Sequence, residues 1–325
     1  MSIRTGIVGI SGFGGGEALR LIAGHPSFDL VYAAGDGSAG ARLIDRFPGV
    51  PRALADLVIR KWDPEALPEL DLLFASLPTG RSADALARVP ASVKIVDIGG
   101  DHRHVAGWTY GLADVWPERI AGQSRVANPG CFPVATLTAL APLLAAGLID
   151  PANIVIDAKT GISGAGRGGG DGRFGFAETN ETLIPYGLLH HVHMPEMETT
   201  IAQLGRGSAA GLVFTPHLVP MTRGLLVTTY ARGRATTGEC LAAARAFYAE
   251  RPFVRVTDQP PQSKWASGSN LAFVSYAADP ARNLVMALGV VDNLGKGAAG
   301  HAVQNANLMV GLPETAGLEG APLWP

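Results

Sequence analysis

The chain has 325 residues, enough for two domains that each bury a hydrophobic core. Hydrophobic residues make up 47% of it and charged residues 17%, as in soluble globular proteins, and the formal net charge of −2 favours neither nucleic acid nor an anionic membrane as partner. Its two cysteines, Cys131 and Cys240, do not suggest a disulfide framework, and its longest apolar run, 137–149, is too short to span a bilayer. We therefore expect a soluble cytoplasmic protein that binds neither membrane nor nucleic acid.

A glycine-rich turn lies between a predicted strand over 3–9 and a predicted helix near the start of the chain. It reads Gly-Ile-Ser-Gly-Phe-Gly-Gly-Gly at 9–16. Glycines let the backbone approach a dinucleotide pyrophosphate, and the helix N-terminus supplies N–H donors to it. The spacing of Gly9, Gly12 and Gly15 is G-x-x-G-x-x-G rather than the commoner G-x-G-x-x-G, and a bare glycine pattern is often only a tight turn. Its position between strand and helix favours a cofactor site.

The second predicted strand, 29–34, ends at Gly-Asp-Gly-Ser, and the residues there bear on the choice of cofactor. An acid at this place usually binds the ribose hydroxyls of NAD, whereas a basic or hydroxyl residue accommodates the 2′-phosphate of NADP. Asp36 favours NAD, while Ser38 and Arg42 are compatible with NADP. Both cofactors therefore remain open on these residues alone.

Further strands are predicted over 70–77 and 93–98, with a helix from Ser82 between them. Strands that alternate with helices over the first 130 residues predict a parallel, Rossmann-like sheet. Loops at the carboxyl ends of its strands line the ligand crevice, which makes Arg103 a candidate contact for an anion. A loop arginine is more often merely solvated.

The stretch Asn-Pro-Gly-Cys-Phe-Pro at 128–133 precedes an apolar run that predicts a helix through Leu148. Pro133 suits the first turn of a helix, so Cys131 should lie at the helix N-terminus. Free N–H groups and the helix dipole there favour an anion, and such a position lowers the pKa of a thiol. A buried structural cysteine is the alternative. The turn before Cys131 and the histidines further along favour a reactive one.

A second glycine-rich loop, 161–170, follows a predicted strand at 153–160, and no helical pattern continues it. We interpret it as an active-site loop that carries Arg167, whose guanidinium suits a carboxylate or a phosphate. Three histidines then occur in His-His-Val-His at 190–193, before a helix predicted through Leu204. No cysteine or carboxylate at a recognised ligand spacing accompanies them, so we expect no metal.

The rest of the chain predicts a second domain of the α+β class. Strands are expected over 214–221, 224–230, 271–276 and 283–291, with a helix over 239–251. This order predicts a mostly antiparallel sheet with a helix across it. The chain closes with a helix through Met309, after a Gly-Lys-Gly that lacks the spacing of a P-loop.

Six motifs stand in order along nearly the whole chain: Gly-Ile-Ser-Gly-Phe-Gly-Gly-Gly-Glu at 9–17, Asn-Pro-Gly-Cys-Phe-Pro at 128–133, Ser-Gly-Ala-Gly-Arg at 163–167, His-Val-His-Met-Pro-Glu at 191–196, Phe-Thr-Pro-His-Leu-Val-Pro-Met at 214–221 and Asp-Asn-Leu-Gly-Lys-Gly-Ala-Ala-Gly at 292–300. Together they resemble the N-acetyl-gamma-glutamyl-phosphate reductases, NADPH-dependent enzymes of arginine biosynthesis in the semialdehyde dehydrogenase family. One such motif could arise by chance, but six in order could not reasonably do so.

The resemblance implies a two-domain enzyme. Residues 1–130 with 293–325 would form the dinucleotide-binding Rossmann domain, to which the last helix returns, and 131–292 would form the catalytic, substrate and oligomerisation domain. The reaction would be reduction of N-acetyl-gamma-glutamyl phosphate to N-acetylglutamate semialdehyde and phosphate. The cofactor would be NADP(H), with NAD(H) left open by Asp36, and the enzyme would be a homodimer or homotetramer without a metal.

The resemblance also implies roles for particular residues. Cys131 would be the nucleophile that forms a thioester, and His193 would stabilise its thiolate and transfer the proton. The implied cofactor contacts are Gly9, Ser11, Gly12, Phe13, Gly14, Ser38, Leu77, Pro78, Gly164 and Asn293. The implied substrate contacts are Asn128, Arg103, Arg167, His191 and Glu196.

The chain departs from the family pattern at three places. It has Asp-Ile-Gly-Gly-Asp-His-Arg at 97–103 in place of Asp-Leu-Ser-Ala-Asp-Phe-Arg, Tyr-Gly-Leu-Ala-Asp at 110–114 in place of Tyr-Gly-Leu-Pro-Glu, and Asp36 in place of a basic residue. The alternatives are a reductase of carrier-linked aminoadipyl phosphate, an aspartate-semialdehyde dehydrogenase, and a regulatory protein that binds NAD(P) without turnover. The His-x-His-x-Pro-Glu motif counts against the aspartate enzyme.

Overall fold

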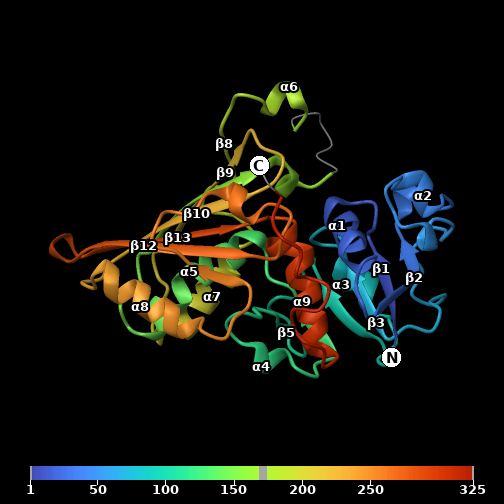
Figure 1. Ribbon diagram of the computed structural model, residues 1–325, viewed down its shortest axis with the longest axis horizontal. Helices are drawn as coiled ribbons and strands as arrows, with labels where there is room; N and C mark the ends of the chain where they lie inside the picture. The colour runs from blue at the N-terminus through green and yellow to red at the C-terminus, as the bar shows by residue number, and fades with distance from the viewer. Residues whose placement is uncertain (1, 168–173, 324–325) are drawn as a thin grey trace. The chain divides into compact units, whose positions relative to one another are not determined.

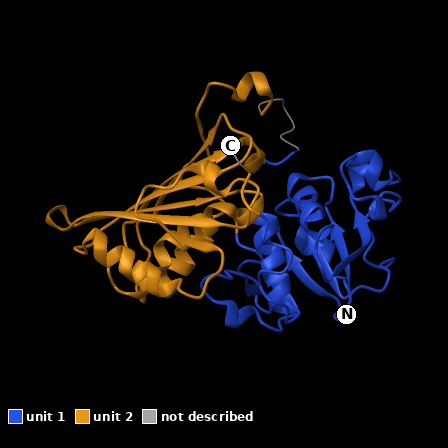
Figure 2. Cartoon of the chain, viewed as in Figure 1, with its two compact units in different colours: residues 1–129, 166–168, 298–320 blue, residues 130–165, 169–297, 321–325 orange. Residues whose placement is uncertain are grey.

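The computed structural model describes residues 2–167 and 174–323 (Figure 1). The chain divides into two compact units (Figure 2). Unit 1 consists of residues 1–129, 166–168 and 298–320, and unit 2 of residues 130–165, 169–297 and 321–325. Part of the predicted active-site loop, 168–170, lies outside the described residues.

Unit 1 contains a six-stranded sheet in the order β2-β1-β3-β4-β6-β5, in which every neighbouring pair is parallel. This confirms the predicted parallel Rossmann-like sheet. The two-residue β5 and three-residue β6 are too short for a periodic pattern and were not predicted. The strands are β1 (Ile3–Val8), β2 (Phe28–Ala34), β3 (Leu72–Ala75), β4 (Lys94–Asp97), β5 (Thr109–Tyr110) and β6 (Arg125–Ala127). The helices are α1 (Phe13–Ile22), η1 (Asp36–Ser38), α2 (Leu43–Arg46), η2 (Arg52–Leu54), α3 (Ser82–Leu86), α4 (Pro117–Ile120) and α9 (Gly300–Met309).

The strand order of unit 1 reverses at β1. From β1 the chain moves to β2 on one side, then crosses over to β3 on the other side. Ligands of open parallel sheets bind at the carboxyl ends of the strands where the order reverses. The glycine-rich turn follows β1 directly, so it lies at this switch point.

Unit 2 contains a seven-stranded sheet in the order β11-β12-β13-β10-β7-β9-β8. Four neighbouring pairs are antiparallel, and β11–β12 and β7–β9 are parallel, which confirms a mostly antiparallel second sheet. The strands are β7 (Val155–Gly161), β8 (Ile184–Pro185), β9 (Val213–Val219), β10 (Leu225–Ala231), β11 (Val254–Val256), β12 (Ala272–Asp279) and β13 (Leu284–Val291). The helices are α5 (Cys131–Ala145), η3 (Ile162–Ala165), α6 (Phe176–Thr179), α7 (Met194–Gly205), α8 (Thr237–Phe247), η4 (Ser263–Ala266), η5 (Pro280–Arg282) and η6 (Gly295–Ala299).

Helix α5 is the core element of unit 2. Thirteen of its 15 residues are buried, because it packs against β10, β12 and β13 as well as α7 and α8. It begins at the predicted Cys131 and ends at Ala145, short of the predicted end at 148. Pro142 inside it has no N–H to donate to the carbonyl of Thr138. The Tyr248 hydroxyl donates to that carbonyl instead, at 2.7 Å, so the buried backbone stays hydrogen-bonded.

None of the helices in the described part of the chain has the length and apolar content that crossing a bilayer requires.

Candidate active site

The glycine-rich turn of unit 1 uses its glycines for different purposes. Gly9 has a φ of +81°, and a Cβ on it would lie 2.0 Å from the Ser76 carbonyl oxygen. A Cβ on Gly15 would lie 2.3 Å from the Gly9 carbonyl oxygen, so this glycine allows α1 to pack on the turn. Gly12 is the N-cap residue of α1. A Cβ on it would meet no atom closer than 3.5 Å, and no side chain caps the helix there. The start of α1 is therefore open to a pyrophosphate, and the turn fits a dinucleotide.

Other predicted cofactor contacts gather around this turn. The Ser11 hydroxyl donates to the Ser38 hydroxyl at 2.9 Å. Phe13, which is exposed, is the first residue of α1. A Cβ on Gly14 would lie 2.7 Å from the Ser76 hydroxyl, so this glycine keeps α1 close to the end of β3. Leu77 and Pro78 follow β3 at the same carboxyl edge, and a Cβ on Gly9 would touch the Leu77 side chain.

Arg167 is described with unit 1 although it follows the strands of unit 2 in sequence. Its guanidinium donates to the Ser11 carbonyl oxygen at 3.1 Å. It therefore contacts the glycine-rich turn, which the sequence did not predict.

The loop after β4 holds Arg103 and the first departure from the family pattern. The buried Asp97 carboxylate accepts hydrogen bonds from the Ser82 hydroxyl at 3.0 Å and from Nδ1 of His102 at 2.6 Å. The His102 ring also stacks on Trp108, so His102 has both a ring contact and a carboxylate partner. Arg103 Nε donates to the Asn128 carbonyl oxygen at 3.0 Å.

The side chain of Asn128 is fully buried and makes hydrogen bonds at both ends of its amide. Its Nδ2 donates to the carbonyl oxygens of Pro129 and Ala298, and its Oδ1 accepts from Asn305 Nδ2 at 2.9 Å. Asn128 thus fixes the backbone just before the Pro-Gly turn.

In unit 2 the half-buried Cys131 is the first residue of α5. Two glycines lie next to it, Gly130 before it in the chain and Gly297 in space. A Cβ on Gly297 would lie 2.9 Å from Cβ of Cys131. Gly297 belongs to the π-helix η6, a local widening that is frequent at functional sites. A Cβ on Gly130 would lie 2.3 Å from Nε2 of His193. The imidazole of His193 thus packs directly on the residue that precedes the thiol.

His193 is held in place by its neighbours. It is the N-cap residue of α7, and its backbone N–H donates to Nδ1 of His191 at 3.1 Å. The rings of His191 and His193 lie 4.7 Å apart, and Phe132 meets both rings edge to face. The structure therefore brings Cys131, His191 and His193 together at the start of α5.

Glu196 lies on the first turn of α7 and is 1% exposed. Its Oε2 accepts a hydrogen bond from the Gly130 N–H at 3.2 Å. A buried carboxylate at this position fixes the turn before Cys131.

Tyr186 is a further candidate that sequence reasoning missed. Its ring lies 5.6 Å from that of His191. Burial raises the pKa of its hydroxyl, and the negative charge of the Cys131 thiolate adds to this effect. An isolated tyrosine next to the two-residue β8 gave no signal in the sequence.

Two predicted cofactor contacts lie in unit 2. Asn293 is buried, and its Oδ1 accepts from the Gly224 N–H at 2.8 Å while its Nδ2 donates to the Ser163 hydroxyl at 2.9 Å. Gly164 lies in η3, next to Ser163. The Asn293 amide thus joins two loops of unit 2. Among the described residues, no group of three or more His, Cys, Asp or Glu side chains could hold a metal ion.

Two family models match the chain. The NAD-binding domain of semialdehyde dehydrogenases matches residues 4–123, and the semialdehyde dehydrogenase dimerisation domain matches residues 131–293. The chain is 80% identical to N-acetyl-gamma-glutamyl-phosphate reductase of Bradyrhizobium sp. (strain ORS 278) and 79% identical to that of Methylobacterium sp. (strain 4-46). Both matches cover 100% of each chain.

Solved structures show the same fold at much lower identity. Aspartate semialdehyde dehydrogenase with NADP from Candida albicans is 19% identical with a TM-score of 0.78, over 95% of this chain and 98% of that chain. Aspartate semialdehyde dehydrogenase II from Vibrio cholerae, complexed with ASA, is 21% identical with a TM-score of 0.75, also over 95% and 98%. With relatives so similar over the full length, the chain belongs to the N-acetyl-gamma-glutamyl-phosphate reductases of the semialdehyde dehydrogenase family.

Proposed function

We propose that this chain reduces N-acetyl-gamma-glutamyl phosphate to N-acetylglutamate semialdehyde and phosphate with NADPH, through a thioester on Cys131. The names of the relatives at 79–80% identity support the substrate. The observation that carries the chemistry is the imidazole of His193 against Gly130, beside a thiol at a helix N-terminus. A nucleophilic thiol needs such a base and such a position.

In the first step the Cys131 thiolate attacks the acyl carbon. A C–S bond forms, the bond from that carbon to the phosphate oxygen breaks, and phosphate leaves. When bound, the nicotinamide supplies the hydride that reduces the thioester carbon. The oxyanion of the resulting thiohemiacetal then re-forms the C=O bond as the C–S bond breaks, which releases the aldehyde and restores the thiolate.

The chain's own groups each have a role in this scheme. His193 takes the thiol proton, and N–H groups at the start of α5 stabilise the oxyanion. Arg103 and Arg167 are the candidate contacts for the phosphate or carboxylate of the substrate. His191 and Glu196 hold His193 and the Gly130 turn in position.

A Cys131→Ala variant tests the scheme. With acyl phosphate and no cofactor, intact mass should show one acyl group on the wild-type chain and on a Cys240→Ser control, and none on Cys131→Ala. A Cys131→Ala enzyme with wild-type turnover would disprove the thioester. Assays in the reverse direction, with phosphate and either N-acetylglutamate, aminoadipate or aspartate semialdehyde, identify the substrate.

The second sheet supports a homo-oligomer. Helices α5 and α8 pack on it, as Figure 1 shows, and along β10 buried residues alternate with half-buried ones that include Leu226 and Tyr230. The half-buried set faces away from these helices, and the matching model is a dimerisation domain. We infer that a second copy covers this face, in a homodimer or a homotetramer built from it. Light scattering of the purified protein gives the subunit number, and a monomer would contradict the inference.

A reduced Cys131 fits a cytoplasmic enzyme.

A further inference from the structure

A short segment, 58–60, extends the sheet of unit 1 beyond β2. Arg60 N–H donates to the Ala33 carbonyl at 2.8 Å, and Gly35 N–H donates to the Arg60 carbonyl at 3.0 Å, in a parallel bridge between Ala34 and Arg60. Because the segment is parallel to β2, residues 61–63 leave it at the carboxyl edge of the sheet. They therefore lie beside the turn after β2, where the adenosine half of a dinucleotide binds.

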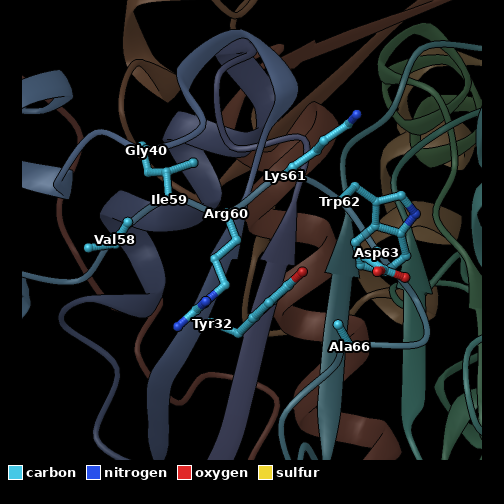
Figure 3. Close-up of a pocket in the computed structure, with 9 residues that line it drawn as sticks. All are labelled: Tyr32, Gly40, Val58, Ile59, Arg60, Lys61, Trp62, Asp63 and Ala66. Carbon is cyan, nitrogen blue, oxygen red and sulfur yellow. The ribbon is translucent and has the colours of Figure 1, made fainter.

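A cavity of about 600 Å³ lies at this place, lined in part by Tyr32, Arg60, Lys61 and Trp62 (Figure 3). Trp62 contacts residues on three sides of this cavity. The Trp62 backbone N–H donates to Asp36 Oδ1 at 3.4 Å, and the Trp62 ring N–H donates to the carbonyl oxygen of Ala85 on α3 at 3.2 Å. The Trp62 ring also meets the Tyr32 ring edge to face.

Of the residues that the sequence offered for the 2′-phosphate of NADP, Ser38 carries no charge and Arg42 is paired with carboxylates. The Ser38 hydroxyl accepts from Ser11, and Arg42 forms ion pairs with both Asp45 and Asp56. The two carboxylates beside Arg42 repel a phosphate dianion, which makes Arg42 a less suitable contact for it.

Arg60 and Lys61 are the two cations that line the cavity, and Lys61 is the one that follows the bridged segment at the carboxyl edge. It is exposed, and within the described ranges it forms no ion pair or hydrogen bond. In Figure 3 its side chain points away from Arg60 and Tyr32. A lysine ammonium binds a phosphate as a point charge.

We propose that Lys61 binds the 2′-phosphate of NADPH and thereby sets the preference for NADPH over NADH. The inference rests on the cofactor proposed above. It explains how a chain with Asp36 after β2 can still prefer the phosphorylated cofactor.

A Lys61→Gln variant tests the assignment, with Arg52→Gln as a matched control that removes the same charge from an exposed residue of unit 1 outside the cavity lining. Calorimetry measures the binding of adenosine 2′,5′-bisphosphate and of AMP, which differ only in the 2′-phosphate. Loss of one charge-assisted hydrogen bond should weaken bisphosphate binding by about tenfold in Lys61→Gln and leave AMP binding unchanged. The KM for NADPH should rise by a similar factor, and that for NADH should not. Arg52→Gln should behave as wild type, and Lys61→Arg should keep most of the preference.

The outcomes separate the two proposals. If the wild-type chain binds the bisphosphate no better than AMP, the proposed NADPH preference is wrong and the role of Lys61 falls with it. If the wild type prefers the bisphosphate and Lys61→Gln keeps that preference, only the assignment to Lys61 is wrong. An equal loss in Arg52→Gln would likewise refute it, because a general loss of positive charge would then explain the result.

Discussion

A methyl group added at Gly130 should displace the imidazole of His193 without removing it. A Cβ there would lie 2.3 Å from Nε2 and 2.6 Å from two ring carbons, whereas ordinary contact begins at 3.4 Å. The ring must therefore retreat by about 1 Å. A misplacement of this size can reduce the rate by about 10²-fold, and complete loss of a general acid–base group by about 10²–10⁴-fold. We expect Gly130→Ala to lose activity within that range.

The variant should still fold. The backbone of Gly130 is extended, with φ −71° and ψ 160°, which alanine adopts without strain. Overpacking typically costs about 1–3 kcal/mol, so thermal unfolding should show a modest loss of stability. Gly24→Ala is a suitable control, because nothing lies within 4 Å of its added Cβ.

A double-mutant cycle tests the cause. His193→Ala removes the ring with which the new methyl group collides, so adding Gly130→Ala to it should reduce the turnover number very little further. If Gly130→Ala costs the same factor with and without the ring, the steric reasoning is refuted.

Two further predictions concern the free thiols and one buried histidine. Burial raises the pKa of the Cys240 thiol to about 11, so near neutral pH iodoacetamide should modify the half-buried Cys131 first; prior labelling of Cys240 in peptide maps would contradict this. Nδ1 of the buried His25 accepts two backbone N–H groups, and burial lowers its pKa below the unfolded value of 6.5. The stability that this neutral ring contributes is complete above pH 6.5 and falls below it by at most about 1.4 kcal/mol per pH unit. Urea unfolding at pH 7.5 and 5.5 should show a smaller pH effect in His25→Asn, and an equal effect would disprove it.

The sequence predicted those parts of the fold that follow from local pattern. Apolar runs bounded by glycine turns predicted β1 to β4, and a proline in the first turn predicted that α5 begins near Cys131. The two- and three-residue strands, such as β8 and β11, escaped prediction because they depend on pairing with distant strands. The π-helix η6 escaped prediction because its widened turn is fixed by packing, and Gly297 against Cys131 is part of that packing.

The glycines show why the site was harder to predict than the fold. Gly9 has a φ of +81°, a requirement of its own backbone that a strand–turn–helix pattern reveals. Gly130 has an ordinary backbone, and its requirement is space for an imidazole 63 positions later in the chain. Asp36 likewise depends on a residue outside its own turn, because its carboxylate accepts a hydrogen bond from the N–H of Trp62. A sequence pattern reports what a residue does for its neighbours in the chain. The proposed contact of Lys61 with the 2′-phosphate depends instead on the bridge between Ala34 and Arg60, which joins two segments that are separate in the chain.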